Sequence, residues 1–255
     1  MGQYNTETPE LKLSFTYPST DNLLFNELRA LAKLKVNTTN NDLEKAQQII
    51  GYAHGLFTHN GDNEPSASDP LTIIKEALAG KSFRCVEYSL LATALLWAYG
   101  IPARTIGLKT KDVETRQYGA GHVVIEFWSN KEQKWIMCDV QAGIIPTKDN
   151  KPLSAVEFGE NVKQGLITDY VAVTGSRFAK DSSFNDIQSY IVWVKEYLYF
   201  YDTPLEMTFE DIDKREQQIV MLVPLGTKPP VTFQGMFKMN ALYTNSTKDF
   251  YSPYI

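Results

Sequence analysis

SFRCVEYSLLATALLWAYGIP, residues 82–102, is the stretch of sequence that decides the fold. Ser82 is a favourable N-cap residue, and Gly100-Ile101-Pro102 stops a helix. Between these signals, the side chains are apolar on nearly every side of the predicted helix. A helix without a polar face is usually buried at the centre of a domain. The stretch therefore predicts a central helix that carries Cys85 near its start.

The rest of the chain predicts helices before this central helix and strands after it. Three earlier segments have apolar side chains at helical spacing: 20–34, 41–61 and 69–80. Three later segments have β-type runs separated by turn residues: 103–108, 122–128 and 134–140. The remainder predicts a loop-rich region, a helix, a strand and an irregular tail: 141–185, 186–201, 219–223 and 224–255. This order predicts an α+β fold.

The composition is that of an ordinary globular protein. The chain has 255 residues, of which 43% are hydrophobic, and its formal net charge is -5. No basic stripe stands out, which disfavours nucleic-acid binding. The sequence has no signal-like start and no run of roughly 18 apolar residues, so we expect no membrane span. Such a chain is cytoplasmic or the mature form of an exported protein; its localisation and oligomeric state stay open.

Cys85 is the candidate nucleophile. A cysteine nucleophile has to be partly thiolate near neutral pH, and unpaired N–H groups in the first turn of a helix stabilise that charge. Thiol catalysis also needs an imidazole to accept the proton and a carboxylate or amide to orient the imidazole. His122 opens one predicted strand, and Asp139 lies near the end of the next. A hairpin of these strands would bring His122 and Asp139 side by side.

The structural alternative for Cys85 is a small core residue, because free cysteine is among the most buried residue types. Cys138 directly precedes Asp139, so these two side chains point to opposite faces of a strand. If Asp139 faces His122, Cys138 packs in the core. A Cys85–Cys138 disulfide and a zinc site formed by both cysteines with His122 are alternatives. Neither explains Asp139, so we expect no metal and no cofactor.

Three motifs stand in order along the chain. The first runs from Phe83 to Leu91 and continues into Tyr99-Gly100-Ile101-Pro102-Ala103-Arg104. The second is Gly121-His122-Val123-Val124-Ile125-Glu126, and the third is Lys134-Trp135-Ile136-Met137-Cys138-Asp139. Together they resemble the cysteine helix, histidine strand and aspartate strand of the transglutaminase-like superfamily. The resemblance covers about residues 40 to 145.

The resemblance implies a papain-like α+β fold, in which a cysteine at the start of a buried helix packs against an antiparallel sheet. It implies Cys85, His122 and Asp139 as the catalytic triad. The superfamily includes cross-linking enzymes, peptide and amide hydrolases, deglycosylating enzymes and members without catalysis. Val123-Val124 and Val140-Gln141 depart from its commoner pattern, which has Ala-Trp after the histidine and Pro after the aspartate. The substrate-side contacts therefore stay open.

The resemblance also places an oxyanion-holding residue upstream of the cysteine helix. His54 or His59 could serve, and a solvated helix end is the alternative for each. Loss of one oxyanion donor typically costs about 10²–10³ in rate.

Other prominent residues have structural interpretations. We expect Arg104 to pair with a carboxylate, and we expect Trp97 and Trp135 to lie in the core. A group of aromatic residues near the predicted C-terminal helix fits a packing face, with a peptide or glycan groove as the alternative. The group is Tyr190, Trp193, Tyr197, Tyr199, Phe200 and Tyr201.

These observations predict a transglutaminase-like cysteine hydrolase or acyltransferase. Its substrate is a peptide or peptide-like amide, cleaved through a Cys85 thioester, with water as the preferred acceptor. An amine-accepting transglutaminase and a catalytically silent peptide- or wall-binding module are the alternatives. We expect an N-terminal extension with one helix, a transglutaminase-like catalytic core, and a C-terminal extension packed on the core: 1–35, 36–160 and 161–255.

Overall fold

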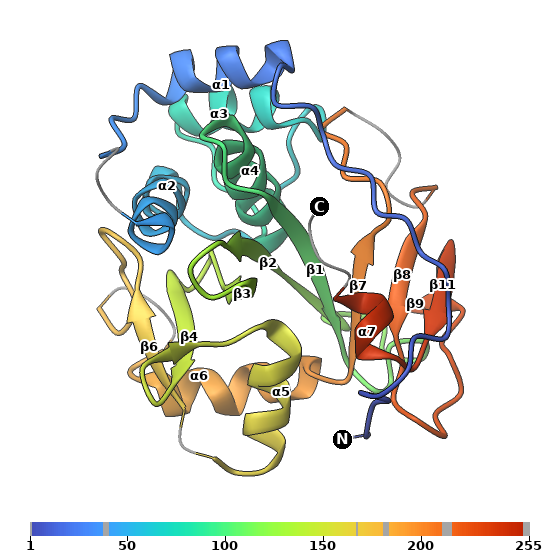
Figure 1. The fold of residues 1–255 in the computed structure, drawn as a ribbon. Helices are drawn as coiled ribbons and strands as arrows, with labels where there is room; N and C mark the ends of the chain where they lie inside the picture. Colours follow the sequence, from blue (N-terminus) through green and yellow to red (C-terminus); the bar gives the residue numbers. More distant parts are fainter. Residues whose placement is uncertain (1, 38–40, 167, 181–183, 211–215, 252–255) are drawn as a thin grey trace.

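Helix α4 (Cys85–Ala98) lies at the centre of the fold, as its apolar sequence predicts. Every side chain from Glu87 to Ala98 is buried. Helices α1, α2 and α3 pack around it, and strands β1 and β2 cover the remaining side (Figure 1). The structure is a computed structural model that describes residues 2–37, 41–166, 168–180, 184–210 and 216–251.

The helices before α4 are α1 (Leu23–Ala32), α2 (Asp42–Leu56) and α3 (Pro70–Leu78). Each follows an Asn or Asp whose side chain accepts an N–H of the first turn: Asn22, Asn41 and Asp69. The capping residue of α1 is thus Asn22, which lies two positions inside the predicted segment 20–34.

The start of α4 also differs from the prediction. Its N-cap is Arg84, not Ser82, so Cys85 is the first helical residue. The Ser82 hydroxyl instead lies 2.9 Å from the Thr58 hydroxyl, within hydrogen-bonding distance. Glu87 closes the first turn by accepting a hydrogen bond from the Arg84 N–H at 3.1 Å.

The strands after α4 form the antiparallel half of the main sheet. They are β1 (Ala103–Lys109), β2 (Gly121–Ser129) and β3 (Lys134–Cys138). Leu108 pairs with His122, and Ile125 pairs with Cys138. The predicted hairpin is therefore present, and Asp139 lies one residue beyond the end of β3.

The C-terminal part of the chain extends the same sheet through β7 (Phe200–Pro204), β8 (Ile219–Leu222) and β11 (Ala241–Thr244). In the described residues the strand order is β11-β8-β7-β1-β2-β3, and only the β11–β8 pair is parallel. The helix predicted over 186–201 is shorter: α6 (Ile187–Val194) and a 3-10 turn (Lys195–Tyr197) precede β7. The long-range pairing of β7 with β1 overrides the helical spacing.

The region predicted as loop-rich also contains short regular elements. They are β4 (Ile144–Lys148), β5 (Lys151–Pro152), α5 (Ala155–Lys163) and β6 (Asp169–Ala172). The tail predicted as irregular contains β9 (Thr232–Phe233), β10 (Phe237–Lys238) and α7 (Thr247–Phe250) in addition to β11.

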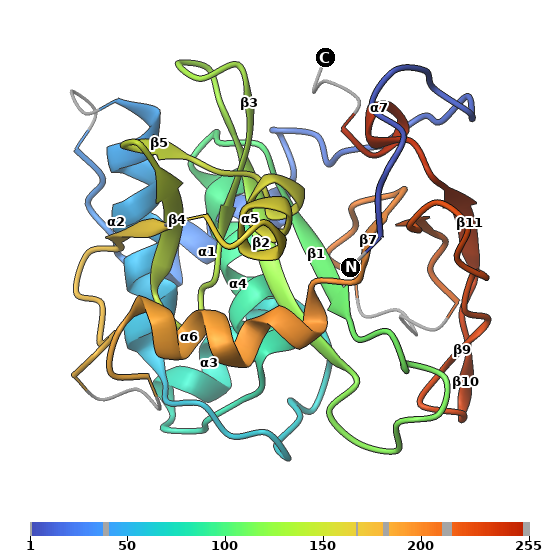
Figure 2. The same cartoon turned by 90° about the horizontal axis from the view of Figure 1, so that it is seen from below.

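The main sheet separates two buried apolar clusters. One cluster joins α1–α4 to one face of the sheet, and the other joins α5 and α6 to the opposite face. The two groups of helices lie on opposite sides of the sheet (Figures 1 and 2). This arrangement confirms the predicted α+β class, with a buried cysteine-bearing helix on a largely antiparallel sheet.

The N-terminal segment runs beside the C-terminal strands (Figure 1). The Asn5 N–H donates to the Asn245 carbonyl at 2.8 Å, and the Thr16 N–H donates to the Leu205 carbonyl at 2.8 Å. The division of the chain at residues 35 and 160 stays a prediction. Within the described ranges, no helix combines the length and apolar character needed to cross a membrane.

A buried ion pair connects the sheet to its surroundings. The Arg104 guanidinium donates two hydrogen bonds to Glu126 Oε2, at 3.1 and 2.8 Å, and one to the Phe250 carbonyl at 2.9 Å. Glu126 Oε1 accepts hydrogen bonds from the Ala155 N–H at 2.8 Å and the Tyr251 hydroxyl at 2.9 Å. The pair thus links β1, β2, the start of α5 and the end of α7, and it confirms the structural role expected for Arg104.

Replacing Arg104 with Met is expected to lower the free energy of unfolding by about 3–5 kcal/mol, because it leaves the Glu126 carboxylate buried without its cation. The matched control is Lys134→Ala, which breaks the partly exposed Lys134–Glu157 pair and should cost less than about 1 kcal/mol. Urea unfolding followed by circular dichroism measures both. Equal effects of the two substitutions would contradict the role assigned to the buried pair.

Candidate active site

Cys85 occupies the partly exposed end of an otherwise buried helix. As the first residue of α4, it stands among backbone N–H groups that have no partner within the helix and that favour negative charge. The Ser89 hydroxyl, one turn further along, donates to the Val123 carbonyl of β2 at 2.9 Å. This bond fixes the start of α4 against the start of β2, where His122 stands.

His122 and Asp139 form a buried pair. His122 Nε2 lies 2.7 Å from Asp139 Oδ2, and the His122 side chain is only 4% exposed. Ile125 and Cys138 are paired, so their side chains share one face of the sheet. His122 lies three positions from Ile125, and Asp139 lies one position from Cys138. Because side chains alternate along a strand, His122 and Asp139 both point to the other face. Cys85 lies close enough to the same ring to help raise its pKa. Because Nε2 is occupied by Asp139, Nδ1 is the nitrogen that faces the sulfur.

The electrostatics of the pair favour a charged imidazole. Burial alone would lower the pKa of His122, but the charge and hydrogen bond of Asp139, with those of Cys85, raise it to about 10. Burial would likewise raise the pKa of Asp139, yet the adjacent His122 and the hydrogen bonds from Ala142 and Tyr190 lower it. At neutral pH the ring therefore carries both protons, and the carboxylate is ionised.

A tight turn and a distant helix hold the Asp139 carboxylate. The Ala142 N–H donates to Oδ1 at 2.9 Å, within a turn that Gly143 closes with φ 74°. The Tyr190 hydroxyl of α6 donates to Oδ2 at 2.8 Å, and its side chain is fully buried. Together with the His122 ring, these groups fix both oxygens of the carboxylate.

Aromatic side chains of α6 and the following turn cover the His122 ring. The Trp193 ring meets it edge to face, with centroids 4.9 Å apart, and the Tyr197 ring lies 6.1 Å away. The sequence pattern favoured a packing face for these aromatics, and they do pack, but against the histidine itself. Tyr190 and Trp193 are therefore site residues that the pattern did not identify, because helical spacing alone does not reveal what a face contacts.

The structure distinguishes the two upstream histidines. His54 is buried, its Nδ1 lies 2.8 Å from the Val140 carbonyl, and its Nε2 accepts the Arg177 N–H at 3.1 Å. Both ring nitrogens are thus used, so His54 is not available to hold an oxyanion. His59 is exposed, and its pKa is lowered first by desolvation and next by the charge of His122. His59 therefore stays a candidate for the oxyanion residue, with a solvated helix end as the alternative.

Cys138 is fully buried in the core on the α4 side of the sheet, and both cysteines are free thiols. This position agrees with the alternation argument, which places Cys138 and Asp139 on opposite faces. Among the described residues, no three His, Cys, Asp or Glu side chains are grouped as a metal site would require.

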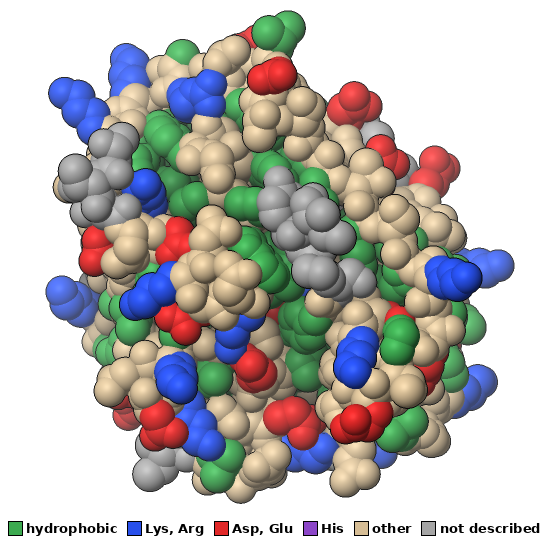
Figure 3. All heavy atoms as spheres, in the orientation of Figure 1, with side chains coloured by type: hydrophobic (Ala, Val, Ile, Leu, Met, Phe, Trp, Pro, Cys, Tyr) green, Lys and Arg blue, Asp and Glu red, His purple; other side chains and the backbone are tan. Residues whose placement is uncertain are grey.

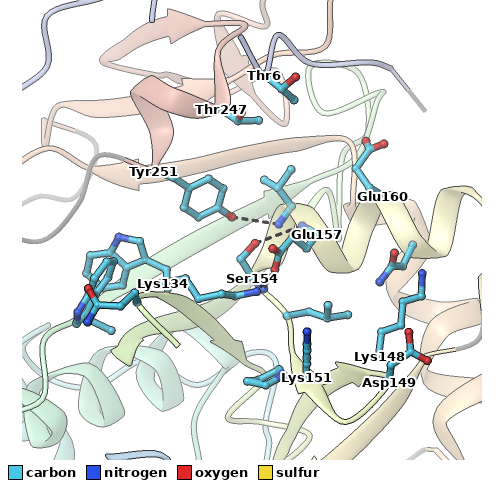
Figure 4. Close-up of a pocket in the computed structure, with 17 residues that line it drawn as sticks. Thr6, Lys134, Lys148, Asp149, Lys151, Ser154, Glu157, Glu160, Thr247 and Tyr251 are labelled. Carbon is cyan, nitrogen blue, oxygen red and sulfur yellow. Dashed lines mark hydrogen bonds and ion pairs between the residues drawn. The ribbon is translucent and has the colours of Figure 1, made fainter. Parts of the chain in front are cut away.

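Two cavities differ in their relation to this site. A pocket of about 320 Å³ is lined by Cys85, Val86 and His122, so it gives access to the sulfur. A larger hollow of about 800 Å³ lies between the β4–β5 hairpin, the start of α5 and α7 (Figure 4). It has no cysteine or histidine in its lining. We therefore place the chemistry in the smaller pocket.

The molecular surface gives no sign of a nucleic-acid interface on the face seen in Figure 3. Both positive and negative side chains occur around the rim of this face, and apolar side chains gather in its middle. A nucleic-acid interface instead concentrates basic side chains on one face.

Comparison with known proteins agrees with this geometry. Residues 29–140 match the model of the transglutaminase-like superfamily, a stretch that contains Cys85, His122 and Asp139. This match confirms the resemblance seen in the three motifs. The match supports a relationship to a family of cysteine-dependent enzymes.

Among solved structures, the chain is similar to a candidate cysteine protease from Cytophaga hutchinsonii, at 20% sequence identity and a TM-score of 0.38. The similarity covers 55% of this chain and 46% of that one, so the chain spans about half of the other protein. No curated protein matches the chain.

The His122 ion pair is expected to make stability depend on pH. The folded-state pKa of about 10 lies above the ordinary value of 6.5. The stabilisation is therefore complete below pH 6.5 and is lost as the pH rises toward about 10. The difference in unfolding free energy between the wild type and His122→Gln should shrink across this range in urea titrations. A difference that stays constant with pH would contradict the pairing.

Proposed function

We propose that the protein is a cysteine hydrolase that cleaves a peptide or peptide-like amide through a thioester on Cys85. One observation carries the proposal: Cys85 acts electrostatically on the His122 ring, which Asp139 holds at 2.7 Å, and Cys85 and His122 line the same pocket. Thiol catalysis needs this combination of nucleophile, imidazole and orienting carboxylate beside space for a substrate.

In the first step, the Cys85 sulfur attacks the amide carbonyl carbon and forms a C–S bond. The carbonyl oxygen becomes an oxyanion, for which the Cys85 N–H at the start of α4 and His59 are the candidate hydrogen-bond donors. His122 then donates its Nδ1 proton to the amide nitrogen, and the C–N bond breaks. The amine leaves, and the acyl group stays on Cys85 as a thioester.

In the second step, water attacks the thioester carbonyl while His122 Nδ1 accepts one of its protons. The C–S bond breaks, the carboxylic acid leaves, and the thiolate–imidazolium pair returns. Water is the acceptor we favour because the pocket is open to solvent, so no second binding site is needed. An amine could take the place of water in the same step, which would make the enzyme a transglutaminase.

Asp139 and its partners orient the imidazole throughout. The Asp139 carboxylate holds Nε2–H, so the ring presents Nδ1 to the sulfur in both steps. Tyr190 acts through Asp139 and is a positioning residue. Trp193 covers the ring and keeps bulk water from the Nε2 hydrogen bond.

Cys85→Ala is expected to reduce kcat/KM by at least about 10³-fold on a peptide amide, because the thioester can no longer form. The matched control is Cys138→Ala, which removes the buried thiol and should keep kcat/KM within a few fold. Iodoacetamide should label Cys85 near neutral pH faster than it labels a free thiol. Mass spectrometry of the labelled protein identifies the site.

Three results of that experiment would go against the proposal. Labelling no faster than that of a free thiol, together with no hydrolysis, would indicate the catalytically silent binding module. Incorporation of a labelled amine in preference to hydrolysis would indicate the transglutaminase. Equal losses in the Cys85 and Cys138 variants would remove the distinction between nucleophile and core residue.

Tyr190→Phe is expected to lower kcat by about 10-fold, the lower end of the loss seen when a partner of a functional group is removed, and to leave KM nearly unchanged. The Tyr190 hydrogen bond helps to lower the pKa of Asp139, so the acidic limb of the pH–kcat profile should move to higher pH. Tyr201→Phe is the control, because Tyr201 is also buried but donates to the Leu198 carbonyl. An unshifted acidic limb would show that Tyr190 has only a packing role.

A further inference from the structure

The pocket beside Cys85 combines apolar walls with the exposed Lys238 and two buried charged side chains. Its far wall is the β9–β10 hairpin, and its apolar lining includes Val86, Leu108, Ile219, Phe233, Phe237 and Met239. Lys109 of β1 and Asp202 of β7 line the same pocket. Its volume of about 320 Å³ lies at the lower end of the ~300–1,000 Å³ range of ligand pockets. A single side chain with its adjoining backbone fits such a volume.

Glycine at position 107 brings the two charges together. Residues 107 and 109 point to the same face of β1, and Gly107 pairs with Asp202 in the sheet. A Cβ on Gly107 would lie only 2.6 Å from Asp202 Oδ1. Because glycine has no Cβ, the carboxylate lies across β1 and forms an ion pair with Lys109. Gly121, opposite Lys109, leaves similar room for the Phe233 ring.

The ion pair is buried, but its hydrogen-bonding capacity is not exhausted. Lys109 and Asp202 are 9% and 8% exposed. Among the described residues, their side chains hydrogen-bond only to each other, unlike the Arg104–Glu126 pair with its further partners. An ammonium has three N–H donors, and a carboxylate has about four acceptor sites. An N–H donor of Lys109 and an acceptor site of Asp202 therefore remain side by side at the wall of the pocket.

Stability alone does not explain this pair. Desolvation offsets most of the attraction within a buried ion pair, and burial lowers the pKa of Lys109 to about 7. Charged groups that are perturbed in this way and line a cleft are concentrated at functional sites. The pair shares its pocket with the candidate nucleophile, which favours a role in binding the substrate.

We propose that the Lys109–Asp202 pair selects a substrate in which the residue supplying the scissile carbonyl carries a carboxamide side chain, Gln or Asn. The inference rests on the proposed function. That residue stays attached to Cys85 in the thioester, so its side chain is the one held closest to the pocket. The carboxamide is recognised by the pocket and is not the bond that is cleaved.

The chemistry of the pair matches a carboxamide at both of its polar atoms. The carboxamide oxygen accepts a hydrogen bond from the Lys109 ammonium, and its NH₂ group donates to the Asp202 carboxylate. A carboxylate side chain would face Asp202, and an ammonium side chain would face Lys109, so each would meet a like charge. An alkyl side chain would leave both polar groups without a partner. The apolar walls contact the methylene groups of the bound side chain.

The test uses fluorogenic peptide amides that differ only in the residue before the scissile bond: Gln, Glu, Lys, norleucine or Ala. For the wild type, kcat/KM for the Gln peptide should exceed that for the Glu, Lys and norleucine peptides by about tenfold or more, a difference typical of one satisfied polar contact. The Ala peptide, which has no side chain to reach the pair, reports whether the hydrolytic chemistry occurs.

The two single substitutions should shift the substrate preference toward side chains of opposite charge. Asp202→Asn removes the negative charge and should raise the Glu-to-Gln ratio of kcat/KM by about tenfold, whereas Lys109→Gln should raise the Lys-to-Gln ratio similarly. Thermal unfolding and iodoacetamide labelling of Cys85 check that each variant is folded. If either single variant does not fold, Lys109→Met/Asp202→Leu replaces the pair with apolar groups, which proteins usually tolerate. This double variant should prefer norleucine to Gln.

The outcomes separate this inference from the function on which it rests. If the wild type cleaves none of the peptides, including the Ala peptide, the proposed hydrolase function fails. If it cleaves all of them and the variants keep the wild-type order of preference, the hydrolase function stands and the role of Lys109 and Asp202 is refuted. Opposite shifts of preference in the two single variants, or loss of the Gln preference in the double variant, support the proposal.

Discussion

A helix that is apolar on every side has to be covered on every side, and this constraint on α4 determines the arrangement of the other elements. Three helices and the β1–β2 pair provide the cover. From Glu87 onward the side chains of α4 are buried, whereas Cys85 at its start is partly exposed. The point at which the helix meets solvent is therefore the position of the candidate nucleophile. Burial of the helix and exposure of its first turn together create the site.

The N-terminal half of the fold could be predicted from sequence because its signals are local. Capping residues, an all-round apolar helix and three β-type runs each act within a few residues of the elements that they define. The C-terminal half lacks such signals. Strand β7 is buried on both faces over most of its length, so it shows no alternation, and its Tyr and Phe residues also fit the preceding helix. Only its pairing with β1 fixes it as a strand.

The residues of the candidate site could likewise be predicted only where the signal is local. Cys85, His122 and Asp139 stand in short motifs whose order along the chain suggests their roles, and the structure brings them together. The predicted N-cap of α4, Ser82, lies two residues before the observed N-cap, because the Ser82 hydroxyl faces Thr58. Tyr190 lies 51 residues from the carboxylate to which it donates. Asp202 reaches its position because residue 107 has no side chain. No local pattern encodes either relationship.

The positions of helix α6 and strand β7 in the sequence also determine when the site is completed during synthesis. A chain emerges from the ribosome N-terminus first, and its domains generally fold in that order. The cysteine, histidine and aspartate are therefore translated well before Tyr190, Trp193 and Asp202, which hold the carboxylate, cover the ring and complete the pocket. The residues around the candidate site are therefore incomplete during most of the synthesis of the chain. The candidate site is complete only after the last of these residues has been synthesised.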